Sequence, residues 1–90
     1  MSIKVYPHSY LHRHTNGLES VEVEGSTVGQ CLDQLIKRFP IIREKLFDKH
    51  GKLYHHVFLS INMDSTHAEN LDKSIEDGDE LHIVLMIDGG

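Results

Sequence analysis

The residues with the clearest chemical potential are the last two, Gly89 and Gly90, which follow Leu85-Met86-Ile87-Asp88. Glycine has no Cβ, so two terminal glycines form a thin strip that can enter a channel too narrow for other residues. Six extended residues reach roughly 20 Å. The carboxyl group of Gly90, with a pKa near about 3.5, is ionised at neutral pH and is a poor electrophile. Another protein must therefore activate it, for example by adenylation to an anhydride that a thiol, sulfide or amine can attack.

A plainer interpretation of the same tail is that chain ends fray and tolerate glycine, or that the sequence was cut at this point. The tail alone does not decide between these two interpretations. In either case the pattern predicts a folded domain over residues 1–85 and a flexible tail over residues 86–90.

Composition narrows the classes of protein to which the chain can belong. Its 90 residues suffice for one domain with a modest core, and 39% apolar with 26% charged residues is typical of a soluble globular protein. No apolar run approaches the roughly 20 residues of a membrane span, and the N-terminus lacks a signal peptide pattern. The single cysteine, Cys31, agrees with a reducing compartment, so we expect a cytoplasmic protein without a membrane partner. The net charge of -5 argues against nucleic acid and favours a basic protein partner.

The first part of the chain predicts two strands. Apolar and polar residues alternate over residues 2–6 and again over residues 21–24, just before Gly25. Between them, residues 7–17 are long for a hairpin loop and contain Asn16-Gly17 as a turn pattern. These two runs make a plausible opening hairpin.

A helix over residues 28–39 is predicted next, with Ser26 or Thr27 as its N-cap. It would be roughly 18 Å long and would end at Pro40. Residues three and four apart form one apolar face, which consists of Val28, Cys31, Leu32, Leu35, Ile36 and Phe39. We therefore expect Cys31 to be a buried small hydrophobe rather than a reactive thiol. A second short helical turn is predicted within residues 41–47.

The remaining segments predict two more strands. Residues 55–61 are rich in β-branched and aromatic residues, and residues 81–85 follow the acidic turn 76–80. A hairpin followed by a crossing helix and further strands is typical of an α+β domain with a mixed sheet. The order is that of the β-grasp (ubiquitin-like) fold, with four to five strands and one main helix packed on one face.

Several short motifs in this order resemble the MoaD/ThiS family of sulfur carriers. They are Thr27-Val28-Gly29, Phe39-Pro40, Asp48 with Gly51-Lys52-Leu53, His56-Val57, Asn62, Asp77-Gly78-Asp79-Glu80 and Gly89-Gly90. Arg13, Thr15 and Gly17 in the first loop resemble the thiocarboxylate carriers of bacterial cysteine biosynthesis. The small subunit of molybdopterin synthase is similar as well. The tail departs from the family pattern, because Met86-Ile87-Asp88 stand where small residues and proline are common.

The resemblance implies a function in which the chain is a protein co-substrate and not an enzyme, acting alone or as the small subunit of a sulfur-transferring synthase. An E1-like enzyme would use ATP and magnesium, neither bound by this chain, to adenylate Gly90. A sulfur donor would then form a thiocarboxylate, and an acceptor synthase would use that sulfur for cysteine or methionine, molybdopterin or thiamin. The alternatives are a ubiquitin-like modifier that is transferred to lysines and a non-catalytic β-grasp interaction module.

Apolar residues next to the glycines are candidates for a partner-docking surface. They are Phe58, Leu85, Met86 and Ile87. The alternative for Phe58 and Leu85 is that both belong to the core on adjacent strands. Asp88 would place a charge beside the glycines, either read by a partner or simply solvated.

Eight histidines in the chain raise the question of a metal site. A zinc site needs three or four converging ligands, and the cysteine lies on the apolar face of the predicted helix. His55 and His56 are adjacent in a predicted strand and would point to opposite sides. The sequence therefore predicts solvated histidines and no metal site.

Overall fold

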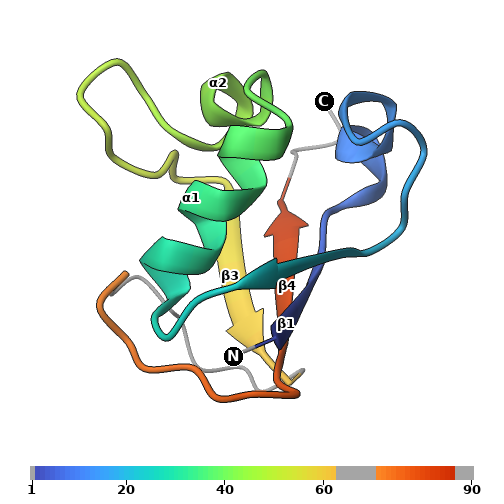
Figure 1. Cartoon of the computed structure of the whole chain (residues 1–90). Coiled ribbons are helices and arrows are strands. Elements are labelled where there is room, and N and C mark those ends of the chain that lie inside the picture. Colours follow the sequence, from blue (N-terminus) through green and yellow to red (C-terminus); the bar gives the residue numbers. More distant parts are fainter. Residues whose placement is uncertain (1, 63–70, 87–90) are drawn as a thin grey trace.

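The computed structural model describes residues 2–62 and 71–86, and its elements lie close to the predicted ones (Figure 1). In chain order they are β1 (Ser2–Tyr6), the 3-10 helix η1 (Ser9–His14), β2 (Val21–Glu24), α1 (Val28–Arg38), α2 (Ile42–Leu46), β3 (Val57–Ile61) and β4 (Glu80–Leu85).

The four strands form one mixed sheet in the order β2-β1-β4-β3. β1 pairs with β2 in antiparallel and with β4 in parallel orientation, while β3 and β4 are antiparallel. Helix α1 crosses one face of this sheet (Figure 1). The predicted α+β architecture with one main helix is thus confirmed, and the last strand of the chain lies at the centre of the sheet.

Alternating residues on the strands build the core under α1. Ile3 and Val5 of β1 and Leu81 and Ile83 of β4 are buried on the helix side. They meet the buried residues of α1, which are Val28, Cys31, Leu32 and Leu35. Cys31 is fully buried, and burial raises the pKa of its thiol, so it acts as a small hydrophobe, as predicted.

Side-chain caps fix where α1 begins. The Oγ1 atom of Thr27 accepts a hydrogen bond from the backbone N–H of Gln30 at 3.2 Å. In return, the backbone N–H and the hydroxyl of Ser26 donate to Oε1 of Gln30 at 2.8 and 2.9 Å. The contact with Thr27 satisfies one of the first N–H groups of the helix, which have no partner within the helix, and the contacts with Ser26 hold the residue before the cap. Phe39 is the C-cap, so the helix ends one residue earlier than predicted.

The loop between β1 and β2 contains η1, which was not predicted. Leu11 of this short helix is buried, and the N–H of Tyr10 donates to Nδ1 of His8 at 3.1 Å. One buried leucine among polar residues produces no periodic pattern, and for this reason the sequence did not indicate a helix. The predicted turn is confirmed, since Asn16 and Gly17 have φ values of 57° and 80°.

The end of β3 is joined to the start of β4 by Asn62 and Asp79. Nδ2 of Asn62 donates to Oδ1 of Asp79 at 3.0 Å, and Oδ1 of Asn62 accepts the N–H of Glu80 at 2.8 Å. The hydrogen bond from Asn62 and that from the backbone N–H of Glu76 lower the pKa of Asp79. This connection holds the start of β4 against the end of β3, in the register in which Ile61 lies opposite Leu81.

Candidate functional site at the end of β4

The predicted reactive tail lies only partly within the described residues. Ile87, Asp88, Gly89 and Gly90 lie outside them, so their roles and the division at residue 85 stay predictions. The described chain ends at Met86, one residue after β4. The geometry of the site is therefore the geometry of the base of the tail.

Hydrogen bonds to β3 fix this base. Leu85 lies opposite Val57, and one residue further the N–H of Met86 donates to the carbonyl of His56 at 2.7 Å. β1 pairs with β4 only from Glu80 to His82. Within the described chain, the last residues of β4 are thus paired with β3 alone, and the backbone is held as far as Met86.

The alternation of β4 places an apolar patch on the outer face of the sheet, which α1 does not cover. Val84 is 37% exposed, and Met86, two residues further, is 61% exposed. Phe58 lies directly opposite Val84 in the antiparallel pair and is partly buried without belonging to the core. We call Phe58, Val84 and Met86 the outer-face patch. It borders the point where the tail begins.

The structure separates the residues that the sequence grouped as a docking surface. Phe58 and Met86 share the outer face, whereas Leu85 pairs with Val57 and packs against the core on the helix side. The alternative of a core position is therefore right for Leu85 and wrong for Phe58. Val84 was missed, although alternation places residues 81, 83 and 85 on one face of the strand and leaves Val84 and Met86 together on the other.

A small polar cluster lies on the same outer face. The rings of Tyr6 and His82 are stacked with centroids 4.6 Å apart, and Nε2 of His82 is 3.3 Å from Oε1 of Glu80. The hydroxyl of Tyr6 donates to Oε2 of Glu80 at 3.5 Å. Ser60 lies opposite His82 on β3. The face therefore offers a partner apolar area near the tail and hydrogen-bonding groups beside it.

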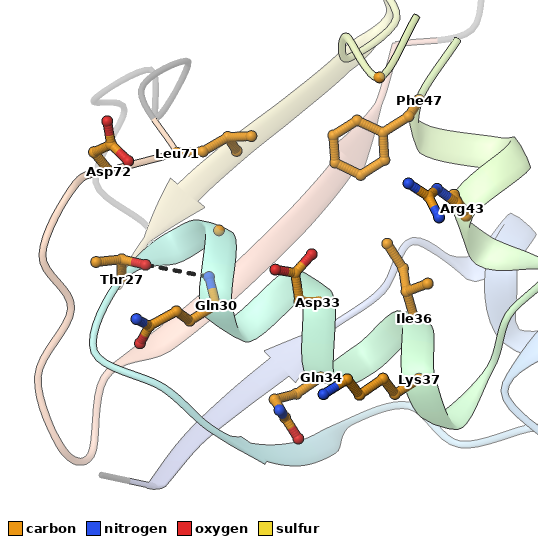
Figure 2. A pocket seen from close by; sticks show the side chains of 12 residues that line it. Thr27, Gln30, Asp33, Gln34, Ile36, Lys37, Arg43, Phe47, Leu71 and Asp72 are labelled. Atoms are coloured by element: carbon orange, nitrogen blue, oxygen red, sulfur yellow. Dashed lines mark hydrogen bonds between the residues drawn. The ribbon is translucent and has the colours of Figure 1, made fainter. Parts of the chain in front are cut away.

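A hollow lies on the helix side, along the exposed side of α1 (Figure 2). It encloses about 750 Å³ and is floored by Ile36, Phe47 and Leu71, with Asp33 and Arg43 beside them. No histidine or cysteine lines it. It lies over the helix and is separate from the outer face.

Residues 2–62 and 71–86 contain no group of three or more His, Cys, Asp or Glu side chains arranged to hold a metal ion. In the same residues, no helix has the length and apolar character needed to cross a membrane.

Comparison with known proteins identifies the family to which the chain belongs. The model of the family described as ThiS matches residues 10–90, which include α1, β3, β4 and the two terminal glycines. The chain belongs to the ThiS family. The resemblance noted from the sequence motifs is thereby confirmed.

Relatives of this ThiS-family chain include carriers and modifiers. The sulfur carrier protein CysO of Mycobacterium tuberculosis is 32% identical over 93 residues, which cover 100% of both chains. The structure of the Amycolatopsis orientalis BexX/CysO complex matches at a TM-score of 0.86 and 28% identity, covering 98% of this chain and 99% of that one. SAMP1 from Haloferax volcanii matches at 0.86 and 27% identity over 100% of both chains. These whole-length matches confirm the β-grasp fold.

Proposed function

We propose that this ThiS-family chain is a sulfur carrier protein that receives sulfur on the carboxyl group of Gly90. The observation that carries the proposal is the 32% identity, over the whole of both chains, to the sulfur carrier protein CysO of Mycobacterium tuberculosis. The base of the tail supports it, because hydrogen bonds hold β4 up to Met86 and leave Gly90 four residues beyond. Four extended residues reach roughly 13 Å. Gly90 can thus react in a partner while the domain stays outside.

The proposed reaction has two steps, both catalysed by the partners. A carboxylate oxygen of Gly90 attacks the α-phosphorus of ATP in an E1-like enzyme that supplies magnesium, and pyrophosphate leaves. A hydrosulfide ion from the sulfur donor then attacks the acyl carbon, AMP leaves with the electron pair of the C–O bond, and loss of a proton gives a thiocarboxylate in which sulfur replaces one oxygen. The carrier supplies no general base, so its role is that of a protein co-substrate. Its contribution is to hold the sulfur close to the reaction centre.

The sulfur is proposed to pass next to an acceptor synthase that binds the carrier directly. The CysO protein of Amycolatopsis orientalis, 28% identical to this chain, forms a complex with BexX. In such a complex, nucleophilic attack by the thiocarboxylate sulfur on an electrophilic biosynthetic intermediate transfers the sulfur to that intermediate. Hydrolysis of the resulting thioester then leaves the sulfur on the intermediate as a thiol and restores the carboxylate of Gly90. Cysteine or methionine, molybdopterin and thiamin synthesis are the candidate destinations.

The outer-face patch is proposed as the surface that docks on these partners. Phe58, Val84 and Met86 place apolar area beside the tail base, and exposed apolar clusters of this kind mark protein interfaces. Ile87 follows directly in sequence and is proposed to extend the contact, with Asp88 and Gly89 following Gly90 into the partner.

Replacing Val84 by Glu tests this docking surface. A charge in the apolar patch must be desolvated on binding, so we expect the KM of the activating enzyme for the carrier to rise at least about tenfold, with kcat unchanged. The matched control is Leu18→Glu, which places the same charge at an apolar residue that is 41% exposed and lies outside the patch. Steady-state kinetics with both variants measure the effect. Equal KM values for the two variants would contradict the docking role.

The function itself is tested by mass spectrometry of the intact carrier. We expect incubation with the E1-like enzyme of the same genome, ATP, magnesium and a sulfur donor to replace one oxygen by sulfur at Gly90. Omitting ATP is the control and should leave the mass unchanged. Absence of the mass increase with every activating enzyme that the genome encodes would refute the proposal.

A ubiquitin-like modifier is the second candidate function. The Haloferax volcanii protein called small archaeal modifier protein 1 is 34% identical over 71 residues, which cover 78% of both chains. For a modifier, lysine amines would attack the adenylated Gly90 and form amide-linked adducts. Adducts at lysines of other proteins in an ATP-supplied cell extract, detected through the attached Gly-Gly remnant, would favour the modifier, and sulfur at Gly90 without adducts would favour the carrier.

A further inference from the structure

Charged side chains are distributed unevenly along this acidic chain. Residues 37–52 contain six of its nine Lys and Arg residues and only two acidic residues, Glu44 and Asp48. This segment thus has a net charge of +4, and because the whole chain has -5, the remainder has -9. All six cationic residues are exposed. We call them the basic pole: Lys37, Arg38, Arg43, Lys45, Lys49 and Lys52.

The basic pole lies at the end of the molecule where the tail begins. The carbonyl of Leu46, at the end of α2, accepts the N–H of Tyr54 at 3.0 Å, and the ring of Tyr54 stacks on His56 at 5.4 Å. His56 in turn binds the N–H of Met86. Figure 1 shows α2 and the C-terminal end of α1 at the end toward which β4 points. A short chain of contacts thus links the basic pole to the base of the tail.

The opposite end of the sheet is acidic. Glu76, Asp77, Asp79 and Glu80 lie in and just after the turn that precedes β4, and Oδ1 of Asp77 accepts the backbone N–H of Ser2. Figure 1 places this turn at the end of the sheet where β4 begins. The molecule therefore has a positive end that carries the tail and a negative end far from it.

The cations of the basic pole are exposed, although Asp33 and Asp72 line the same hollow as Lys37 and Arg43. In the described part of the chain, none of them forms a salt bridge. Arg38 donates through Nη1 to the carbonyl of Glu22 at 3.1 Å and lies over the ring of Phe39. The carboxylate of Asp48 is held by the backbone N–H groups of Lys52 and His50, which are the main hydrogen bonds that lower its pKa, and the charge of Lys52 adds to this.

We propose that the basic pole orients the carrier on its activating enzyme by pairing with an acidic rim around the entrance to the channel that takes up the tail. This inference rests on the proposed function and adds the chemistry of the partner. An exposed cluster of one sign steers association, with rate gains of about 10 to 1,000-fold that fall with ionic strength. The net charge had suggested a basic partner, whereas the basic pole suits an acidic surface. The two expectations differ because the net charge is a sum over two ends of opposite sign.

The test compares two double variants with equal changes in net charge. Lys45→Gln with Lys49→Gln removes two charges from the basic pole, and both side chains are exposed, so folding should be unaffected. Lys4→Gln with Lys73→Gln removes two charges elsewhere. We expect the first pair to raise the KM of the activating enzyme for the carrier about tenfold at low salt, with kcat unchanged and the difference lost near about 0.5 M salt. The second pair should change KM less than about twofold.

Equal KM changes for the two double variants, or a difference that salt does not reduce, would overturn the inference. Calorimetry of the carrier binding to the enzyme without ATP gives the same comparison even where no sulfur is incorporated. A failure of the sulfur reaction is therefore distinguishable from a failure of the proposed pairing between the basic pole and the acidic rim. A fluorescent single-stranded DNA of about 20 nucleotides supplies the last arm. Binding of this DNA near 0.15 M salt that depends on Lys45 and Lys49 would assign the pole to nucleic acid instead.

Discussion

Removing Gly90 is expected to lower sulfur loading at least about a hundredfold without unfolding the domain. The deletion moves the terminal carboxyl about 3.5 Å back toward the sheet, and an error of about 1 Å in a reacting group can already cost about 100-fold in rate. β4 ends at Leu85 and the last described backbone contact is at Met86, so the deletion removes none of the described hydrogen bonds. Intact-protein mass spectrometry measures the loading, and thermal unfolding should give an unchanged Tm.

A variant extended by one glycine beyond Gly90 is the matched control. It keeps glycine at the end and changes the reach by the same distance in the opposite direction. Loss of sulfur loading in both variants would show that the exact position of the carboxyl group is decisive. Loading retained only in the extended chain would show that the tail needs a minimum length. Full loading of the shortened chain would contradict the assignment of Gly90 and favour a plain interaction module.

Most of the fold could be predicted because local patterns agree with the tertiary structure. Alternation predicted β1 and β2 with the bounds that the structure has, and Thr27 with Pro40 bracketed α1. Each pattern reports which side of an element is apolar, and burial on one face of the sheet is what folding requires. For this reason the buried position of Cys31 was also predictable.

The face of β3 could not be predicted in the same way. Val57, Phe58 and Leu59 are consecutive apolar residues, so a period of two does not choose which of them faces the core. Pairing with β4 decides this, because Leu59 lies opposite the buried Ile83 and Phe58 opposite the exposed Val84. The outer-face patch thus follows from a register that only the folded sheet defines.

The positive charge near the base of the tail was not predicted, for a similar reason. A net charge of -5 is a sum over the chain, and it conceals a run from Lys37 to Lys52 that is positive. The position of this run relative to the tail depends on the contact between Leu46 and Tyr54 and on the pairing of His56 with Met86. Both contacts join segments that sequence patterns place in separate elements.

Shortening Leu81 to Ala is expected to lower the free energy of unfolding by about 2–5 kcal/mol. Leu81 is fully buried on an inner strand, opposite Val5 of β1 and Ile61 of β3, so the cavity would lie between both neighbouring strands and α1. The total free energy of unfolding of a domain of this size is about 5–15 kcal/mol, so the loss is a large part of it. With a usual urea m-value, the midpoint of unfolding should fall by about 1–3 M. Equilibrium urea unfolding followed by circular dichroism measures the shift.

Val84→Ala on the same strand is the control, and its cost should stay below about 1 kcal/mol because Val84 is partly exposed on the outer face. The two faces of β4 then separate stability from docking. Leu81→Ala should unfold early and yet keep the KM of the activating enzyme wherever it remains folded, whereas Val84→Glu should raise KM in a domain of nearly normal stability. A Leu81→Ala variant as stable as the parent would show that β4 is not packed as an inner strand of the sheet. The inference that β4 fixes the base of the tail would then be wrong as well.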